Sequence, residues 1–164
     1  MAAAATRLSG RPVLPGRASG PALVTRDPIN FTAALTKIAN VPLRRRAELR
    51  DEHHPLFGKN IAGRVLVFPS CIGSTHTGLV LLDLVSKGRG PAGLVVQRSD
   101  SLLVSGIVLS DVWFHRSIPI VEYAGDDLFA RIADDDTVEV DGTTGEVSVV
   151  RSTGAANHVQ PRSA

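Results

Sequence analysis

The middle of the chain alternates between strand patterns and helix patterns, and this alternation constrains the fold more than any other feature. Two helix patterns, at 75–89 and 99–114, separate three aliphatic runs, GRVLVFP (63–69), AGLVVQ (92–97) and SIPIVEY (117–123). Continuous β-branched runs are typical of strands buried on both faces, whereas apolar residues three or four positions apart predict helices. Strands joined through helices pair in parallel with right-handed crossovers. The alternation therefore predicts a parallel sheet.

Further extended segments flank this core. GPALVT (20–25) predicts a short strand, and DTVEVDG (136–142) and GEVSVV (145–150) predict a C-terminal β-hairpin. Residues 27–42 predict a loop with a short helical turn. Residues 44–54, RRRAELRDEHH, have little apolar face and predict a solvated connection. The predicted class is α/β, with a parallel core sheet, a C-terminal hairpin and a second, mostly antiparallel layer.

Length and composition indicate one folded unit between two tails. The chain has 164 residues, of which 43% are hydrophobic, enough for the core of a single domain. Residues 1–19 are rich in Ala, Gly, Pro and Arg, and residues 152–164 are polar, so both are expected to be disordered tails around a domain at 20–151. The start has Arg and Ala without acidic residues, which leaves an organelle-targeting role open.

Charge and cysteine content exclude several classes of protein. The formal net charge is +2, too weak a bias to indicate nucleic-acid binding. No apolar run approaches the roughly 18 residues that a membrane span needs. A single cysteine, Cys71, excludes an internal disulfide and a self-contained cysteine metal site. We expect a chain that binds no metal itself and works in a reducing compartment, the cytoplasm.

The turn FPSCIGSTHTG (68–78) is the strongest candidate for a site. It follows the first buried strand, at the edge of a parallel sheet where ligands tend to bind. Gly73 lets a ligand approach the backbone, while Ser70, Ser74 and Thr75 place hydroxyl groups beside the free amides of the next helix. Such a site suits a carboxylate or a phosphate.

The same residue types also have ordinary structural roles. Serine or threonine before a helix is a common cap, and the turn lacks both dinucleotide and P-loop spacing. Cys71 is typical of a small buried apolar residue, and His76 of a surface residue in a first helical turn. His53 and His54 have no partner at metal-ligand spacing. On residues alone, simple capping is favoured.

Segments 63–123 and 134–147 together resemble the small, swivelling subunit of the aconitase X family. The matching pieces follow in order: a strand ending in Pro, the Gly-Ser turn, GRGPA at 88–92, IP at 118–119 and VDGTTG at 140–145. The resemblance covers about residues 16–150. It implies a swivelling three-layer β/β/α domain.

The resemblance also implies an activity. Members of this family are dehydratases (hydro-lyases) in which a large subunit carries iron or an iron-sulfur cluster and a small subunit closes over the active site. Their substrates include cis-3-hydroxy-L-proline and, as an alternative here, mevalonate 5-phosphate. Ser74 takes the place of the family's proton-abstracting serine, and the neighbouring turn residues would bind substrate; these are Ser70, Cys71, Gly73, Thr75 and His76. The chain alone is expected to be inactive.

Departures from the family pattern, which include the segment after Phe31, keep other functions open. Ile72 stands where the family commonly has a basic residue, and Thr77 and Gly78 replace a second Gly-Ser or serine run. One alternative is a phosphohistidine carrier domain in which His76 accepts the phosphoryl group. Another is a non-catalytic binding module, in which Ser74→Ala leaves every activity of the assembled complex unchanged.

Overall fold

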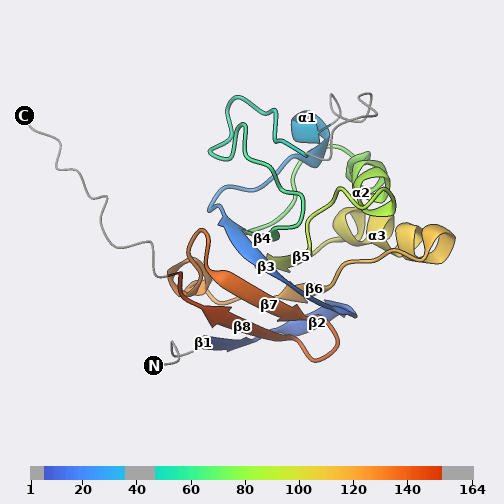
Figure 1. Cartoon of the computed structure of the whole chain (residues 1–164). Helices are drawn as coiled ribbons and strands as arrows, with labels where there is room; N and C mark the ends of the chain where they lie inside the picture. Colours follow the sequence, from blue (N-terminus) through green and yellow to red (C-terminus); the bar gives the residue numbers. More distant parts are fainter. Residues whose placement is uncertain (1–5, 36–46, 153–164) are drawn as a thin grey trace, which may run out of the picture.

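The computed structural model describes residues 6–35 and 47–152, and its strands form one eight-stranded sheet in the order β1-β8-β7-β3-β4-β5-β6-β2 (Figure 1). The strands are β1 Thr6–Ser9, β2 Arg11–Leu14, β3 Arg17–Val24, β4 Val65–Phe68, β5 Gly93–Val96, β6 Ile120–Glu122, β7 Thr137–Asp141 and β8 Glu146–Val150. The helices are α1 Phe31–Leu35, α2 Thr77–Ser86, α3 Ser101–Phe114 and α4 Leu128–Arg131.

The centre of the sheet is parallel, as predicted. β3 pairs with β4, β4 with β5 and β5 with β6, all in parallel. Helices α2 and α3 connect β4 to β5 and β5 to β6, and both lie with α1 on one face of the sheet. α3 begins close to its predicted start because Asp100 caps it, its carboxylate accepting the Leu103 N–H at 2.8 Å.

One long strand, β3, joins the parallel and antiparallel parts. Arg17–Pro21 pairs antiparallel with β7, and Ala22–Val24 pairs in parallel with β4. β7 and β8 form the predicted C-terminal hairpin, and β1 pairs with β8. The second, antiparallel layer is therefore built from both ends of the chain.

The predicted disordered tail at 1–19 is wrong for residues 6–19. β1 and β2, the two ends of the sheet order, are separated only by Gly10. Gly10 donates its N–H to the Gly145 carbonyl at 2.8 Å, and a Cβ there would lie 2.5 Å from the Glu122 carbonyl oxygen. Since β1 pairs with β8 and β2 with β6, this segment closes the sheet on itself.

The composition of this segment conceals its role because backbone pairing, more than side-chain burial, holds it in place. Only Leu8 is buried in β1, and none of the four residues of β2 is buried. Residues 1–5 and 153–164 lie outside the described residues, and so does most of the predicted C-terminal tail.

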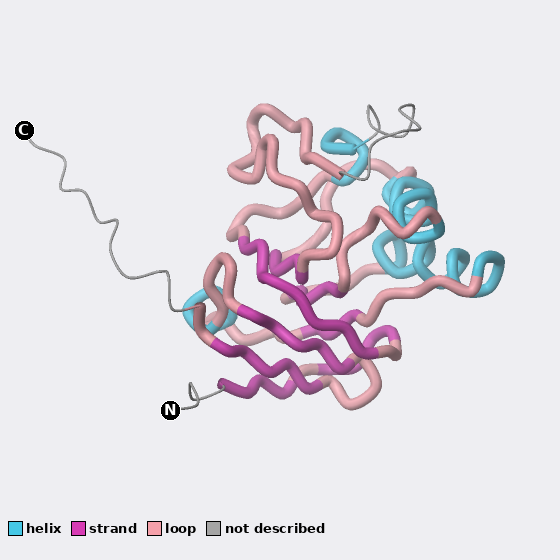
Figure 2. Tube along the Cα trace, viewed as in Figure 1, coloured by secondary structure: helices cyan, strands magenta, loops and turns pink. Residues whose placement is uncertain are grey.

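The parallel part of the sheet separates two apolar cores. Figure 2 shows this part between the helices and the antiparallel strands. Leu66 and Phe68 of β4 point to the core beneath α1, α2 and α3. Val65 and Val67 of the same strand point to the core beneath β1, β7, β8 and α4. A strand buried on both faces thus lies in the middle of three layers, which confirms the β/β/α swivelling fold.

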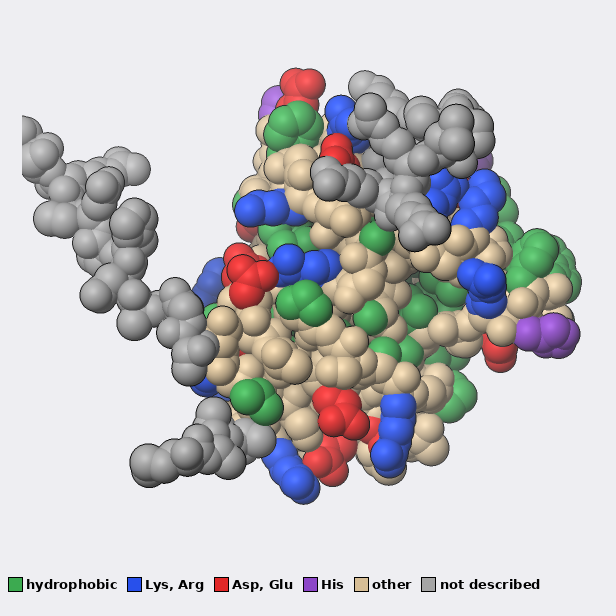
Figure 3. All heavy atoms as spheres, viewed as in Figure 1, with side chains coloured by type: hydrophobic (Ala, Val, Ile, Leu, Met, Phe, Trp, Pro, Cys, Tyr) green, Lys and Arg blue, Asp and Glu red, His purple; other side chains and the backbone are tan. Residues whose placement is uncertain are grey.

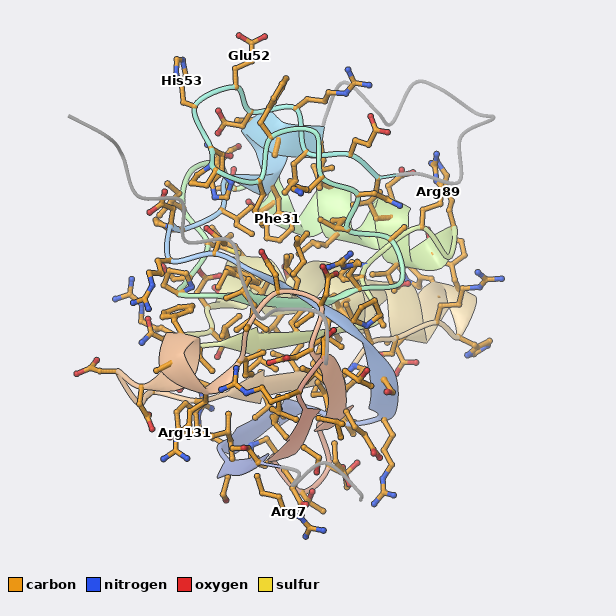
Figure 4. All side chains as sticks on the ribbon, turned by 60° about the vertical axis from the view of Figure 1, so that its left-hand side comes forward. Arg7, Phe31, Glu52, His53, Arg89 and Arg131 are labelled. Atoms are coloured by element: carbon orange, nitrogen blue, oxygen red, sulfur yellow. The ribbon has the colours of Figure 1, made fainter. Side chains whose placement is uncertain are left out.

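The connection after α1 differs from the prediction. Ala47 and Leu49 have no exposed surface, so residues 47–54 are not simply solvated. The Asn60 side-chain oxygen accepts the N–H groups of Ala47 and Ala62 within the loop, and the Arg50 N–H reaches the Ala34 carbonyl of α1 at 2.8 Å. In Figure 4, Phe31 points inward from α1, whereas Glu52 and His53 lie at the outer tip of the loop. The predicted elements within 36–46 lie outside the described residues.

Candidate active site at the turn between β4 and α2

The turn after β4 is held on both sides by neighbouring loops. On one side, Ile29 donates its N–H to the Ser70 carbonyl, and Ile72 donates its N–H to the Ile29 carbonyl, both at 3.1 Å. On the other side, the Arg98 N–H reaches the Pro69 carbonyl at 2.9 Å. These loops follow β3 and β5, so the turn lies at the carboxyl edge of the parallel strands, where the sequence predicts a site.

Gly73 is required by both conformation and space. Its φ is +97°, a region that side chains rarely adopt. A Cβ at this position would lie 2.5 Å from the side-chain nitrogen, Nδ2, of Asn30. Asn30 is itself held, because its Oδ1 accepts the Ala33 N–H at 3.1 Å at the start of α1. The glycine therefore sets the direction in which the next residue, Ser74, enters the site.

Ser74 makes several hydrogen bonds at the entrance to α2. The residue is partly buried, and its Oγ accepts the backbone N–H of His76 at 3.1 Å and lies 2.8 Å from His76 Nδ1. Its carbonyl accepts the N–H of Thr77 at 3.1 Å and the Thr77 hydroxyl at 3.0 Å. The expected side-chain cap is absent, because the N-cap residue of α2 is His76 and no side chain caps the helix. Ser74 instead closes a turn just before α2, which holds its hydroxyl next to an imidazole.

The position of α2 is fixed by an unusually close helix contact. A Cβ on Gly78 would lie 2.8 Å from Ser105 Oγ, and a Cβ on Gly106 would overlap the Gly78 carbonyl. The backbones of α2 and α3 therefore touch directly, one turn beyond Ser74. Gly78, a departure from the family pattern, has a packing role here.

Cys71 does not share this accessible face. It is 9% exposed and belongs to the core beneath the helices. Burial, with a smaller effect from the charge of Asp100, raises the pKa of the Cys71 thiol, so the thiol stays protonated. An iron-sulfur cluster needs several thiolates, and the one cysteine here does not fit such a group. Within 6–35 and 47–152, no three His, Cys, Asp or Glu residues are grouped to hold a metal ion.

The other predicted site residues lie around the turn at different depths. Thr75 and His76 are exposed, while Ser70 is partly buried and uses its carbonyl to bind Ile29. His53 and His54 lie in the loop after α1; His54 Nδ1 accepts the Leu56 N–H at 3.1 Å, a structural role. The structure thus brings together Ser74, Thr75 and His76 and leaves Cys71 in the core.

Two nearby residues were not identified from the sequence. Asn30 packs against Gly73, a contact between segments more than 40 positions apart with no local signal. Arg98 follows β5, is exposed, and makes no ion pair with another described residue. Its position after a predicted buried strand was the available signal, since such loops share one edge of the sheet.

No helix among the described residues is long and apolar enough to cross a bilayer.

Comparisons with known proteins agree with this architecture. The chain is 32% identical over 143 residues to the phosphomevalonate dehydratase small subunit of Methanocella arvoryzae, covering 87% of this chain and 98% of that protein. It is 34% identical over 110 residues to cis-3-hydroxy-L-proline dehydratase of Pseudomonas aeruginosa, covering 67% of this chain and 18% of that protein.

A solved structure and a family profile extend the match. The crystal structure of aconitase X from Thermococcus kodakaraensis (holo-form) superposes with a TM-score of 0.74 at 27% identity, over 89% of this chain and 99% of that one. Residues 7–149, which include β2 and all of β1 but its first residue, match the profile of the aconitase X swivel domain. The resemblance inferred from the turn and hairpin motifs is confirmed: the chain belongs to the aconitase X swivel-domain family.

Proposed function

We propose that this chain is the small subunit of a dehydratase that removes water from a 3-hydroxy carboxylate, and that Ser74 takes the proton from substrate. Relatives with two different substrates in their names are all dehydratases, which supports a common reaction. Both named substrates carry a proton on the carbon beside the carboxylate and a hydroxyl on the next carbon. Loss of that proton and that hydroxyl gives an alkene and water.

The observation that carries the proposal is the placement of the Ser74 hydroxyl. Ser74 is a partly buried residue at the carboxyl edge of the parallel strands, before α2, and its hydroxyl accepts a backbone N–H. Backbone N–H groups at a helix start favour negative charge on an oxygen. This environment therefore favours electron density on Ser74 Oγ as the hydroxyl gives up its own proton, and that electron density is what lets Oγ accept the substrate proton.

This environment is insufficient without a partner. A helix amino terminus stabilises an anion by at most about 2 kcal/mol, or roughly 1.5 pKa units, far too little to ionise an alcohol near neutral pH. Further charge and exclusion of water must come from a surface that covers the turn. We assign this to a large subunit that carries iron or an iron-sulfur cluster, and expect the chain alone to be inactive.

Substrate anions would be oriented by the turn and its neighbour. Gly73 leaves the backbone accessible, Thr75 offers an exposed hydroxyl, and Arg98 offers an exposed guanidinium on the adjoining loop. Arginine binds a carboxylate or a phosphate through paired hydrogen bonds. Arg98 would supply the positive charge that Ile72 does not. We take cis-3-hydroxy-L-proline as the first substrate to test, with mevalonate 5-phosphate as the alternative.

The test starts with the intact complex. The tagged chain would be purified from its source, the proteins that accompany it identified by mass spectrometry, and both substrates assayed on the complex. Ser74→Ala should lower the rate about 10²- to 10⁴-fold, the usual contribution of a positioned proton-transfer group. Ser86→Ala, the same change at the far end of α2, is the matched control and should leave the rate unchanged.

Two results would overturn the proposal. One is a chain that purifies alone and without iron. The other is a Ser74→Ala complex with full activity, which would favour the binding module. Acid-labile phosphate on His76 would favour the phosphohistidine carrier.

A further inference from the structure

We infer that His76 acts as a positioning residue that accepts the hydroxyl proton of Ser74 while Ser74 accepts the proton of the substrate; this inference rests on the function proposed above. The two side chains are joined by a 2.8 Å contact between Ser74 Oγ and His76 Nδ1. They lie two residues apart in a turn whose backbone is fixed on both sides. The pair is therefore built into the turn and needs no rearrangement to form.

The hydrogen-bonding capacity of the hydroxyl decides which way this contact runs. A serine hydroxyl has one proton to donate and two lone pairs. One lone pair of Ser74 Oγ already accepts the backbone N–H of His76 at 3.1 Å. If His76 Nδ1 carried a proton and donated it, the second lone pair would also be occupied, and Ser74 would have none left for a substrate proton.

The opposite tautomer leaves Ser74 competent. With the ring proton on Nε2, Nδ1 is an acceptor, the Ser74 O–H donates to it, and one lone pair on Oγ remains free. A proton-abstracting role for Ser74 is compatible only with this arrangement. The inference thus follows from the two contacts between Ser74 Oγ and His76 and from the number of lone pairs on that oxygen.

The proton transfer balances without forming a free alkoxide. The substrate C–H bond breaks and a new O–H bond forms at Ser74 Oγ, while the original O–H bond breaks and an N–H bond forms at His76 Nδ1. The electron pair of the C–H bond becomes the second bond of the alkene, and the substrate hydroxyl departs with its own pair. The proton now on His76 and the departing hydroxide together make up the released water.

A measurement on the full chain alone tests the tautomer directly. Long-range ¹H–¹⁵N correlation spectra of histidine-labelled protein report which ring nitrogen carries the proton. For His76 we expect the Nε2-protonated form, and Ser74→Ala should shift the Nδ1 signal while Ser86→Ala does not. An Nδ1-protonated ring in the wild type would overturn the inference and leave the proposed dehydratase function standing.

Chemical rescue in the active complex tests the proton transfer. His76→Ala should lower kcat about tenfold or more with little change in KM. Added imidazole should restore a large part of the lost rate, because removal of the ring leaves a space of its shape beside Ser74 Oγ. His76→Gln, which retains hydrogen-bonding groups without a basic nitrogen, should stay slow. Imidazole should not restore Ser74→Ala, and His53→Ala, at the tip of the loop after α1, should behave as wild type.

The outcomes separate the two ideas. If Ser74→Ala is inactive and His76→Ala is fully active, only the role of His76 fails. The same holds if His76→Ala and His76→Gln lose activity equally and imidazole restores neither. If Ser74→Ala is active, the proposed function itself fails.

Discussion

Two glycine-containing turns at opposite ends of the strands use their polar groups in opposite ways. In the hairpin turn between β7 and β8, Asp141 Oδ1 accepts the N–H groups of Thr143 at 2.9 Å and Thr144 at 3.1 Å. The Gly145 carbonyl accepts the N–H of Gly10 at 2.8 Å, and Arg17 forms an ion pair with Asp141 at 2.7 Å. Each of these polar groups is already bonded within the molecule and is therefore not free to bind a ligand.

The turn between β4 and α2 is fixed mainly through its backbone. Its carbonyls and N–H groups bind the loops after β3 and β5, while Ile72, Thr75 and His76 remain exposed. A turn held by its backbone leaves side chains available for a ligand or a partner. The comparison indicates that changes in the hairpin turn should lower stability, whereas changes in the site turn should lower activity or association.

The largest effect is expected for Gly142→Ala in the hairpin turn. A Cβ there would overlap the Leu14 carbonyl and lie 3.0 Å from the Pro119 side chain. Because a backbone atom cannot move aside as a side chain does, the free energy of unfolding should fall by about 3 kcal/mol, the upper part of the range for overpacking. Urea denaturation of the purified chain measures it.

Gly58→Ala is the matched control for that change. Gly58 has φ +75°, but nothing lies within 4 Å of a Cβ at this position. The free energy of unfolding of Gly58→Ala should fall by only about 1 kcal/mol, the usual cost of this conformation for a residue with a side chain. Equal losses for the two variants would show that space at Gly142 is not what the hairpin turn requires.

A somewhat smaller loss of stability, with a clear loss of activity, is expected for Gly73→Ala. The φ of +97° and the contact with Asn30 should together lower the free energy of unfolding by about 2 kcal/mol. Activity of the complex should fall at least tenfold, because small displacements of a reacting group have large effects on rate.

Adding Asn30→Ala to Gly73→Ala distinguishes the effect of the steric contact with Asn30 from the effect of the backbone conformation at position 73. The double variant removes the contacting side chain, so it should regain stability relative to Gly73→Ala, provided that the lost Asn30–Ala33 hydrogen bond costs less. Activity should stay low because φ at position 73 remains constrained. If the double variant recovers activity as well, the direction of Ser74 is set by the contact with Asn30 and not by φ.

These same regions show what the sequence predicts and what it does not. The strands at 65–68, 93–96 and 120–122 were predictable because residues buried on both faces leave a continuous aliphatic run. β1 and β2 were not, because Arg7, Arg11 and Pro12 resemble a polar tail and the pairing partners of these strands lie more than 100 positions away.

The candidate site divides in the same way. Ser74 and Gly73 were identified from their place after a buried strand, and the motif resemblance gave Ser74 its expected role. Asn30 and Arg98 were missed because each depends on contact between separate loops. The Ser74–His76 pair is local, but the Oγ–Nδ1 contact depends on side-chain rotamers that sequence spacing does not specify.

The dependence of stability on acid pH should distinguish the two turns, because the hairpin turn contains Asp141, a carboxyl group with a lowered pKa. Burial alone raises the pKa of this carboxyl, but the N–H groups of Thr143 and Thr144 and the charge of Arg17 outweigh it, so the pKa lies below its ordinary value of 3.8. A lowered pKa adds stability that is present above pH 3.8 and is lost as pH falls further. Asp141→Asn should therefore reduce the loss of stability between pH 5 and 3, measured by urea denaturation.

Two comparisons check that assignment. Ser74→Ala should follow the wild-type acid profile, since it removes no carboxyl group. Some acid sensitivity should remain in Asp141→Asn, because hydrogen bonds from Arg11 and Ser99 lower the pKa of Glu122 from 4.5 to about 2. An Asp141→Asn profile identical to wild type would mean that Asp141 does not contribute to the acid stability of the hairpin.

The smallest effect on stability is expected for Ile72→Ser in the site turn. Ile72 is 50% exposed, so its loss should change the free energy of unfolding by no more than about 0.5 kcal/mol.

Hydrophobic side chains exposed on this chain also gather over the C-terminal end of α3, away from the turn (Figure 3). Ile72 differs from them because it lies two residues from Ser74, where the proposed large subunit must exclude water. Ile72→Ser should therefore weaken association with that subunit several-fold, measured by titration of the two purified subunits. Val150→Ser, at 40% exposure in β8, is the matched control and should leave association unchanged. Equal weakening by both variants would place the partner on the antiparallel layer as well. It would contradict the expectation that the site turn contributes to association and the hairpin turn to stability.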